Sequence, residues 1–144
     1  MAKITFFSEE ISFNLTRKLF LKKWITEVIA LENKQKGEIN YIFCNDSYLS
    51  QINLEYLKHD TLTDIITFDY TLDHNGLISG DIFISIDRVR ENAILLQLPF
   101  SEELHRVMIH GILHLIGYKD KTKALKAIMR QKEDISLSLQ LQIK

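Results

Sequence analysis

Three residues between positions 110 and 120 have the types and spacing of metal ligands. His110 and His114 interrupt the apolar run MIHGILHLI, which otherwise has the composition of a buried helix. Side chains four residues apart lie on one helical face, with Cβ atoms about 5–6 Å apart, so both imidazoles can reach one cation. Gly117 permits a left-handed helix end that reverses the chain and brings Asp120 back towards the rings. Because a catalytic zinc ion typically takes three protein ligands and one water, the stretch predicts a metal centre.

Other interpretations of these residues exist. The histidines could be partly buried, hydrogen-bonded residues of a core helix, with Asp120 in an ordinary turn, or the third ligand could be His105 or Glu133. The zinc-protease motif H-E-x-x-H needs a glutamate beside the first histidine, and Gly111 stands there instead. Two histidines and a carboxylate also form the facial triad of non-haem iron oxygenases. Those sites usually lie on strands, whereas this pair lies on a predicted helix.

The elements that must position these residues alternate between strand and helix patterns. The β-rich segments 4–7, 38–44, 65–72 and 80–86 predict strands, and the last two form a hairpin through a DHNG turn. Helical patterns follow Asn14, Asn45 and Ser101 as N-caps, and two more occupy 88–98 and 122–139. The order predicts an α+β fold. We expect one domain, 1–144, with a small mixed sheet of about four strands covered by about five helices.

Composition and charge narrow the function classes. The chain has 144 residues, 46% of them hydrophobic and 26% charged, and its formal net charge of −1 gives no global positive field for nucleic acid. Cys44 is the single cysteine, which favours a reducing compartment, and no apolar stretch is long enough to span a membrane. We therefore expect a cytoplasmic protein without a membrane partner. Positive charge gathers next to the histidines, where these lysines are candidate phosphate-binding residues: Lys119, Lys121, Lys123 and Lys126.

The stretch HGILHLIGYKD, residues 110–120, resembles the signature H-G-x-L-H-L-x-G-Y-D-H of the YbeY family of rRNA-maturation endoribonucleases. Seven of the nine fixed positions match. INLEYLKHDTLTDIITF at 52–68 is similar to the family's L-N-x-x-[FY]-R…T-[DN]-V-L-S-F, and SGDIFIS at 79–85 is similar to its L-G-D-I-x-I-S. The three stretches occur in the family order.

The resemblance implies a zinc-dependent, single-strand-specific endoribonuclease of ribosome biogenesis that matures the 3′ end of small-subunit (16S) rRNA. The family's three histidine ligands fall on His110, His114 and Asp120, with one Zn²⁺ per chain. Oxygen in place of a third nitrogen shifts the preference towards Mn or Fe, and Ni is a further candidate. The family arginine falls on Leu57, and the neighbouring Lys58, a candidate substrate-binding residue, offers only a point charge in its place.

The expected chemistry is metal-assisted phosphodiester cleavage, in which a metal-bound water is the catalytic group and no protein base is assigned. The expected partners are single-stranded RNA, the small ribosomal subunit and assembly factors, for a monomeric enzyme. Two alternatives remain: a non-catalytic assembly factor with a structural metal, and a metallohydrolase with a non-RNA substrate. The remaining histidines are expected to be surface or structural residues: His59, His74 and His105.

Overall fold

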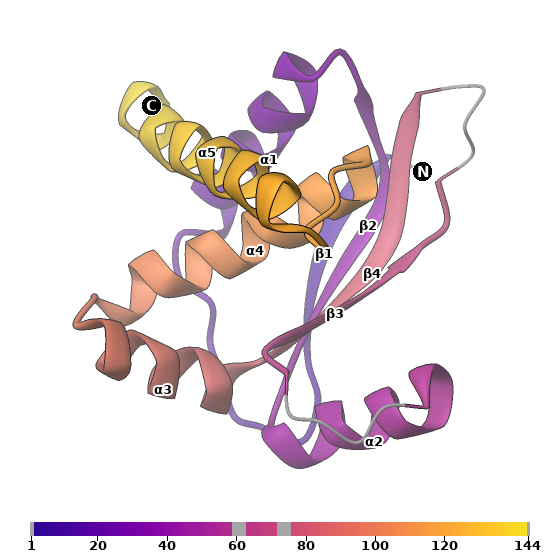
Figure 1. Ribbon diagram of the computed structural model, residues 1–144, viewed down its shortest axis with the longest axis vertical. Coiled ribbons are helices and arrows are strands. Elements are labelled where there is room, and N and C mark those ends of the chain that lie inside the picture. Colours follow the sequence, from indigo (N-terminus) through magenta and orange to yellow (C-terminus); the bar gives the residue numbers. More distant parts are fainter. Residues whose placement is uncertain (1, 59–62, 72–75, 144) are drawn as a thin grey trace.

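The computed structural model describes residues 2–58, 63–71 and 76–143 (Figure 1). This part of the chain forms an α+β fold with four strands and five α-helices, as the sequence predicts. The elements in chain order are β1 (Lys3–Ser8), α1 (Lys18–Leu31), β2 (Gln35–Cys44), α2 (Asp46–Leu57), β3 (Ile65–Asp69), β4 (Leu77–Ser85), α3 (Ile86–Leu96), α4 (Phe100–Ile116), α5 (Lys123–Leu139) and the short 3₁₀ helix η1 (Gln140–Gln142).

The sheet is mixed, with strand order β1-β2-β4-β3. β1, β2 and β4 are parallel, whereas β3 is antiparallel to β4, with Ile65 opposite Ile84 and Asp69 opposite Gly80. The predicted antiparallel pairing of the last two strands is therefore confirmed. Of the predicted DHNG turn that joins them, residues 73–75 lie outside the described residues. The antiparallel strand β3 forms one edge of the sheet, next to α4.

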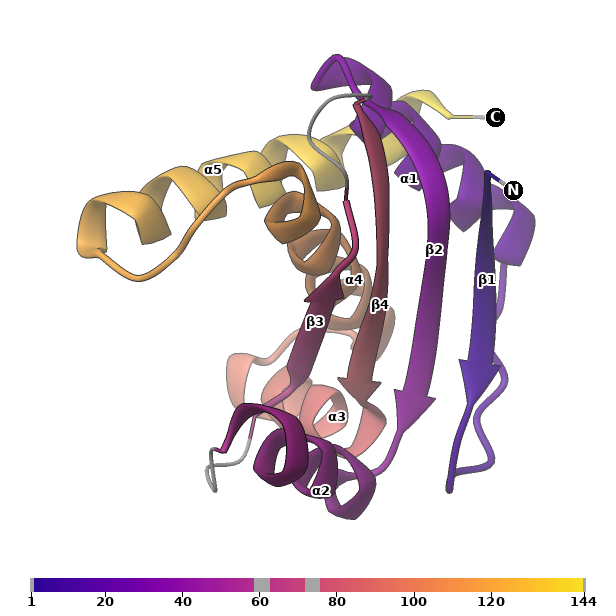
Figure 2. The same ribbon diagram turned by 90° about the vertical axis from the view of Figure 1, so that its right-hand side faces the viewer.

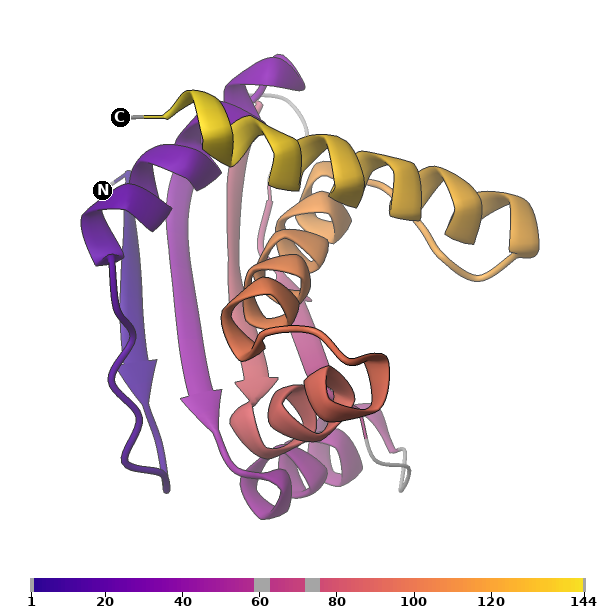
Figure 3. The same ribbon diagram turned by 90° about the vertical axis from the view of Figure 1, so that its left-hand side faces the viewer.

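The two faces of the sheet carry different layers (Figures 2 and 3). One face is covered by α1, α3, α4 and α5, and it holds the main core around Trp24, Tyr41 and Ile82. The lower part of the other face is covered by α2, above a small cluster formed by Cys44, Leu49 and Ile66. Alternation along the strands explains the split, because successive side chains point to opposite faces. None of the helices in the described ranges has the length and apolarity needed to cross a bilayer.

Two of the three predicted N-caps are wrong, and the helix predicted for 88–98 begins at Ile86. Asn45 is an N-cap as expected and accepts a hydrogen bond from the Tyr48 N–H at 2.8 Å. Asn14 is not one, because Leu15 is already buried in the core and the chain turns into α1 only at Arg17. Ser101 lies inside the first turn of α4, whose N-cap is Pro99. Proline suits this boundary because its ring fixes φ and it has no N–H to leave unpaired.

The backbone of α4 lies unusually close to the sheet. A Cβ at Gly111 would stand 2.9 Å from Ile82 Cγ2 and 3.1 Å from Ile65 Cδ1. One turn further along α4, Leu115 lies equally close to Gly80 of β4, since a Cβ at Gly80 would lie 2.9 Å from Leu115 Cδ2. Glycine at both points lets helix and sheet approach without steric overlap. The side of α4 that carries Gly111 thus packs against the sheet in the core.

We predict that Gly111→Val lowers the free energy of unfolding by about 1–3 kcal/mol, because the added methyls overpack the contact with Ile82. Chemical denaturation of the metal-free protein measures the change. Ala127→Val, at an exposed position of α5, is the control for the poor helix propensity of valine and should cost less than about 1 kcal/mol. Equal losses of unfolding free energy in Gly111→Val and Ala127→Val would show that the contact between Gly111 and Ile82 is not tight.

Candidate metal centre

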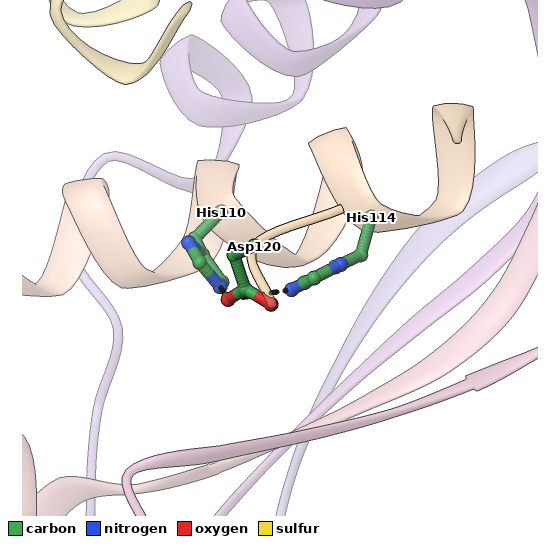
Figure 4. A group of neighbouring side chains, drawn as sticks. All are labelled: His110, His114 and Asp120. Atoms are coloured by element: carbon green, nitrogen blue, oxygen red, sulfur yellow. Dashed lines mark ion pairs between the residues drawn. The ribbon is translucent and has the colours of Figure 1, made fainter. Parts of the chain in front are cut away.

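The structure brings His110, His114 and Asp120 together. Figure 4 shows the two histidines on one side of α4, with the Asp120 carboxylate from the following loop between their rings. The Nε2 atoms of His110 and His114 each lie 3.4 Å from Asp120 Oδ2. Ligand atoms of all three residues lie within 4.8 Å of one another, and these residues form the one such group found in the described ranges.

These separations fit a small divalent cation. In a tetrahedral zinc site the bonds to nitrogen and oxygen are about 2.0–2.2 Å long, which places neighbouring ligand atoms about 3.3–3.5 Å apart. Both nitrogen–oxygen distances to Asp120 fall in that interval. The imidazole rings lie 4.5 Å apart between centroids and are nearly perpendicular, at 80°. The three side chains could therefore hold a metal ion without rearrangement of the backbone.

The end of α4 is what returns Asp120 to the helix. Gly117 has φ 127°, a conformation that favours glycine, and its N–H donates to the Leu113 carbonyl at 3.1 Å. The Tyr118 N–H donates to the same carbonyl at 3.0 Å, as in a Schellman-type helix end. The Tyr118 hydroxyl then donates to Glu32 Oε1 at 2.6 Å, which anchors the loop to the C-terminal end of α1.

Both histidines are hydrogen-bonded through Nδ1. His110 Nδ1–H donates to Glu133 Oε2 at 2.7 Å, and His114 Nδ1–H donates to the Tyr118 carbonyl at 3.0 Å. A carboxylate and a carbonyl can only accept, so Nε2 of each neutral ring keeps its lone pair on the Asp120 side. Glu133, considered as a third ligand, therefore contacts the nitrogen remote from Asp120. His105 is also outside the group, since it pairs with Gln140 at 3.1 Å.

The electrostatic surroundings differ for the two rings. Burial lowers the pKa of His110, but the hydrogen bond and charge of Glu133 outweigh it, so the pKa is raised. At His114, burial and the positive charge of His110 lower the pKa. Burial acts to raise the pKa of Glu133, and the hydrogen bonds from His110 and Arg106 bring it below the ordinary value. Glu133 is thus an ionised carboxylate at neutral pH.

A cavity of about 300 Å³ opens beside His110 and Asp120. Asp64, directly before β3, lies in its wall, and burial raises the pKa of this carboxyl group. Asp64 and Arg106 are site residues that the sequence reasoning missed. The available signal for Asp64 was its place directly before the predicted strand at 65–72. The full lining consists of Asp64, Ile65, Glu103, Arg106, Val107, His110, Asp120, Arg130 and Glu133.

The predicted substrate-binding lysines are all exposed. Lys119 and Lys121 flank Asp120 in the loop, and the other two lie in the first turns of α5. Lys58 belongs to a different element, because it is the left-handed C-cap of α2. Of the remaining histidines, His59 and His74 lie outside the described residues.

Comparison with known proteins assigns the family. Residues 3–140 match the family described as Endoribonuclease YbeY. The chain belongs to the YbeY family. It is 56% identical to the Endoribonuclease YbeY of Flavobacterium psychrophilum over 133 aligned residues. The alignment covers 92% of this chain and 94% of the relative. The Flavobacterium johnsoniae YbeY is 53% identical with the same coverage.

A solved structure supports the same fold. The solution structure of a Thermotoga maritima protein aligns with a TM-score of 0.62 and 27% sequence identity, over 94% of this chain and 89% of that one. The YbeY resemblance seen in the sequence, and the α+β architecture predicted from the order of strand and helix patterns, are both confirmed. The match begins at residue 3, so it includes β1 and α1, for which no motif had been recognised.

We predict that Gly117→Ala lowers the free energy of unfolding by about 1–3 kcal/mol, because an L residue is strained at φ 127°. Urea denaturation of the metal-free protein measures the loss. Lys121→Ala, in the same loop but exposed, should stay within about 0.5 kcal/mol of the unaltered protein. An equally small change in the free energy of unfolding for Gly117→Ala and Lys121→Ala would show that the chain reversal does not require glycine.

Proposed function

We propose that this chain is a metal-dependent endoribonuclease that cleaves single-stranded RNA and acts in ribosome biogenesis, including maturation of the 3′ end of small-subunit rRNA. One observation carries the proposal: three ligand atoms converge beside a cavity in a chain whose residues 3–140 match the YbeY family. The relatives bear the name Endoribonuclease YbeY. Residues 1–144 would act as a single catalytic domain in the cytoplasm, as a monomer, on RNA of the small subunit with its assembly factors.

The proposed cofactor is one Zn²⁺ per chain, with His110, His114 and Asp120 as its protein ligands. Two imidazole nitrogens and a carboxylate oxygen form a donor set that zinc accepts, and Mn, Fe or Ni are alternatives because of the oxygen donor. When bound, the cation supplies Lewis-acid stabilisation of the charge that develops on the phosphoryl oxygens. The hydrogen bonds from Nδ1 of both rings support the assignment, since they leave each Nε2 lone pair on the side of Asp120.

The residues around the metal have separate tasks. The Asp120 carboxylate would offset part of the cation's charge. The cavity next to it would take the scissile phosphate, with Arg106, Arg130 and the bound cation offsetting the charge of the four acidic residues in its wall. The exposed lysines of the α4–α5 loop and α5 would hold backbone phosphates, which gives affinity without reading the base sequence. Binding of an extended single strand fits such a sequence-independent contact set.

One observation favours a second candidate function, that of a non-catalytic assembly factor. Leu57, 40% exposed at the end of α2, occupies the position of the family arginine and cannot bind phosphate. A protein without that contact could serve as an assembly factor in which the metal is structural. Cleavage of RNA by the purified protein distinguishes the two functions.

We predict that the purified protein cleaves a single-stranded RNA oligonucleotide, spares its duplex form, and loses activity with a chelator. Activity should return when Zn²⁺ or Mn²⁺ is added back in excess. His114→Ala, incubated under the same conditions, is the control for a contaminating nuclease. Retention of RNA binding without any cleavage would instead support the assembly-factor function.

We predict that Asp120→Ala weakens Zn²⁺ binding nearly as much as His114→Ala, by more than the about 10- to 100-fold typical of losing an outer-shell partner. Asp120→His should bind zinc at least comparably to the unaltered protein, and Asp120→Asn poorly, because a neutral amide does not offset the cation. Competition with a chromophoric chelator measures the affinities. Unchanged affinity in Asp120→Ala would eliminate this carboxylate as a ligand.

We predict that RNA affinity falls steeply with salt and that the combined variant Lys121→Gln, Lys123→Gln and Lys126→Gln shows a shallower slope. Each phosphate contact to a single strand contributes about 0.7 to the slope of log K against log salt. The combined variant Lys3→Gln and Lys18→Gln, also at exposed positions, is the control and should keep the original slope. Identical slopes in the two variants would remove the lysines from the substrate site.

A further inference from the structure

Glu133 of α5 contacts the metal centre from the side opposite to Asp120. Its Oε2 accepts the hydrogen bond of His110 Nδ1–H at 2.7 Å, while Nε2 of the same ring faces Asp120 Oδ2 at 3.4 Å. The outer hydrogen bond of an imidazole determines which nitrogen is left for a metal. We propose that Glu133 is a positioning residue, which fixes the ring orientation and tautomer of His110 and makes its Nε2 a stronger donor.

The Glu133 carboxylate is itself held in place at both oxygens. Its side chain is only 7% exposed, and its Oε1 accepts from Arg106 Nη1 at 3.0 Å while Oε2 serves His110. A buried carboxylate needs such partners to remain ionised. With one oxygen bonded to the guanidinium and the other to the ring, the carboxylate cannot rotate without breaking one of the two bonds. The orientation of His110 therefore depends on a rigid acceptor.

Arg106 also connects this contact to the docking of α5. Its Nη2 lies 3.0 Å from Asp134 Oδ1, so one guanidinium pairs with two successive acids of α5. Arg106 and His110 are four residues apart on α4 and thus share a face. Asp134 differs from Glu133 in being 59% exposed, and in the part of the chain that the structure describes its side chain forms an ion pair with Arg106 alone. Asp134 therefore serves as a matched control.

The proposal rests on the proposed metal site, because a positioning residue has an effect only if His110 is a ligand. Carboxylates that orient a metal-bound histidine typically change metal affinity by about 10- to 100-fold when they are removed. Glu133→Gln keeps the shape and an accepting oxygen but loses the charge. Glu133→Ala loses both and leaves the Arg106 Nη1 atom without its carboxylate. The amide variant is therefore the main test, since it is least expected to disturb folding.

The test measures Zn²⁺ affinity by chelator competition in the unaltered full-length protein and in Glu133→Gln, Glu133→Ala and Asp134→Asn. We expect affinity to fall about 10-fold in Glu133→Gln and about 100-fold in Glu133→Ala. Asp134→Asn should change it less than about 2-fold, because exposed ion pairs contribute little. Imidazole ¹⁵N–¹H spectra of the zinc-loaded proteins provide the second measurement. The His110 Nδ1–H proton should move upfield in Glu133→Gln and keep its position in Asp134→Asn.

The outcomes separate the two proposals. Unaltered protein that binds no zinc overturns both the metal site and the role of Glu133. Zinc binding that is equally tight in the unaltered protein and both Glu133 variants leaves the site intact and overturns the positioning role. Equal losses in Glu133→Gln and Asp134→Asn would assign the effect to packing between α4 and α5, which also overturns it.

Discussion

The close packing of α4 on the sheet is the constraint from which the rest of the site follows. Gly111 is pressed against Ile82, so this side of the helix is fixed towards β4. His110, next to it, and His114, one turn on, then lie half-buried at the border of the core, with their Nε2 atoms turned towards the returning loop. A glutamate at position 111 would bring its side chain against Ile82 and Ile65, so this packing does not suit the base of the protease motif.

The site depends on three segments, although only one of them carries both histidines. The loop after Gly117 contributes Asp120 and, through the Tyr118 carbonyl, the hydrogen bond that orients His114. α5 contributes no candidate ligand, yet its Glu133 is hydrogen-bonded to His110. Such hydrogen bonds to the histidines require little further loss of side-chain entropy, because packing of the helices has already buried the side chains that make them. The ligand geometry is in this sense a product of tertiary packing rather than of one short motif.

The sequence predicted the sheet composition, the antiparallel pairing of the last two strands and the proximity of His110, His114 and Asp120 because these depend on local patterns. Alternation and β-branched residues specify β3 and β4, and the i, i+4 spacing and a glycine specify the histidine face. The starts of α1 and α4 were misplaced because burial of Leu15 and the fixed φ of Pro99 outweigh the side-chain capping signals of Asn14 and Ser101. The contacts of Asp64 and Arg106 could not be predicted, since each joins residues distant in the sequence.

X-ray absorption at the zinc edge, recorded on protein loaded with one equivalent of Zn²⁺, tests the ligand set most directly. The geometry predicts a first shell of nitrogen and oxygen alone at about 2.0–2.2 Å, with the multiple-scattering pattern of two imidazole rings. A first shell that contains sulfur at about 2.3 Å, which only Cys44 or a methionine could supply, would contradict this ligand set. A spectrum with fewer than two imidazoles would contradict it equally.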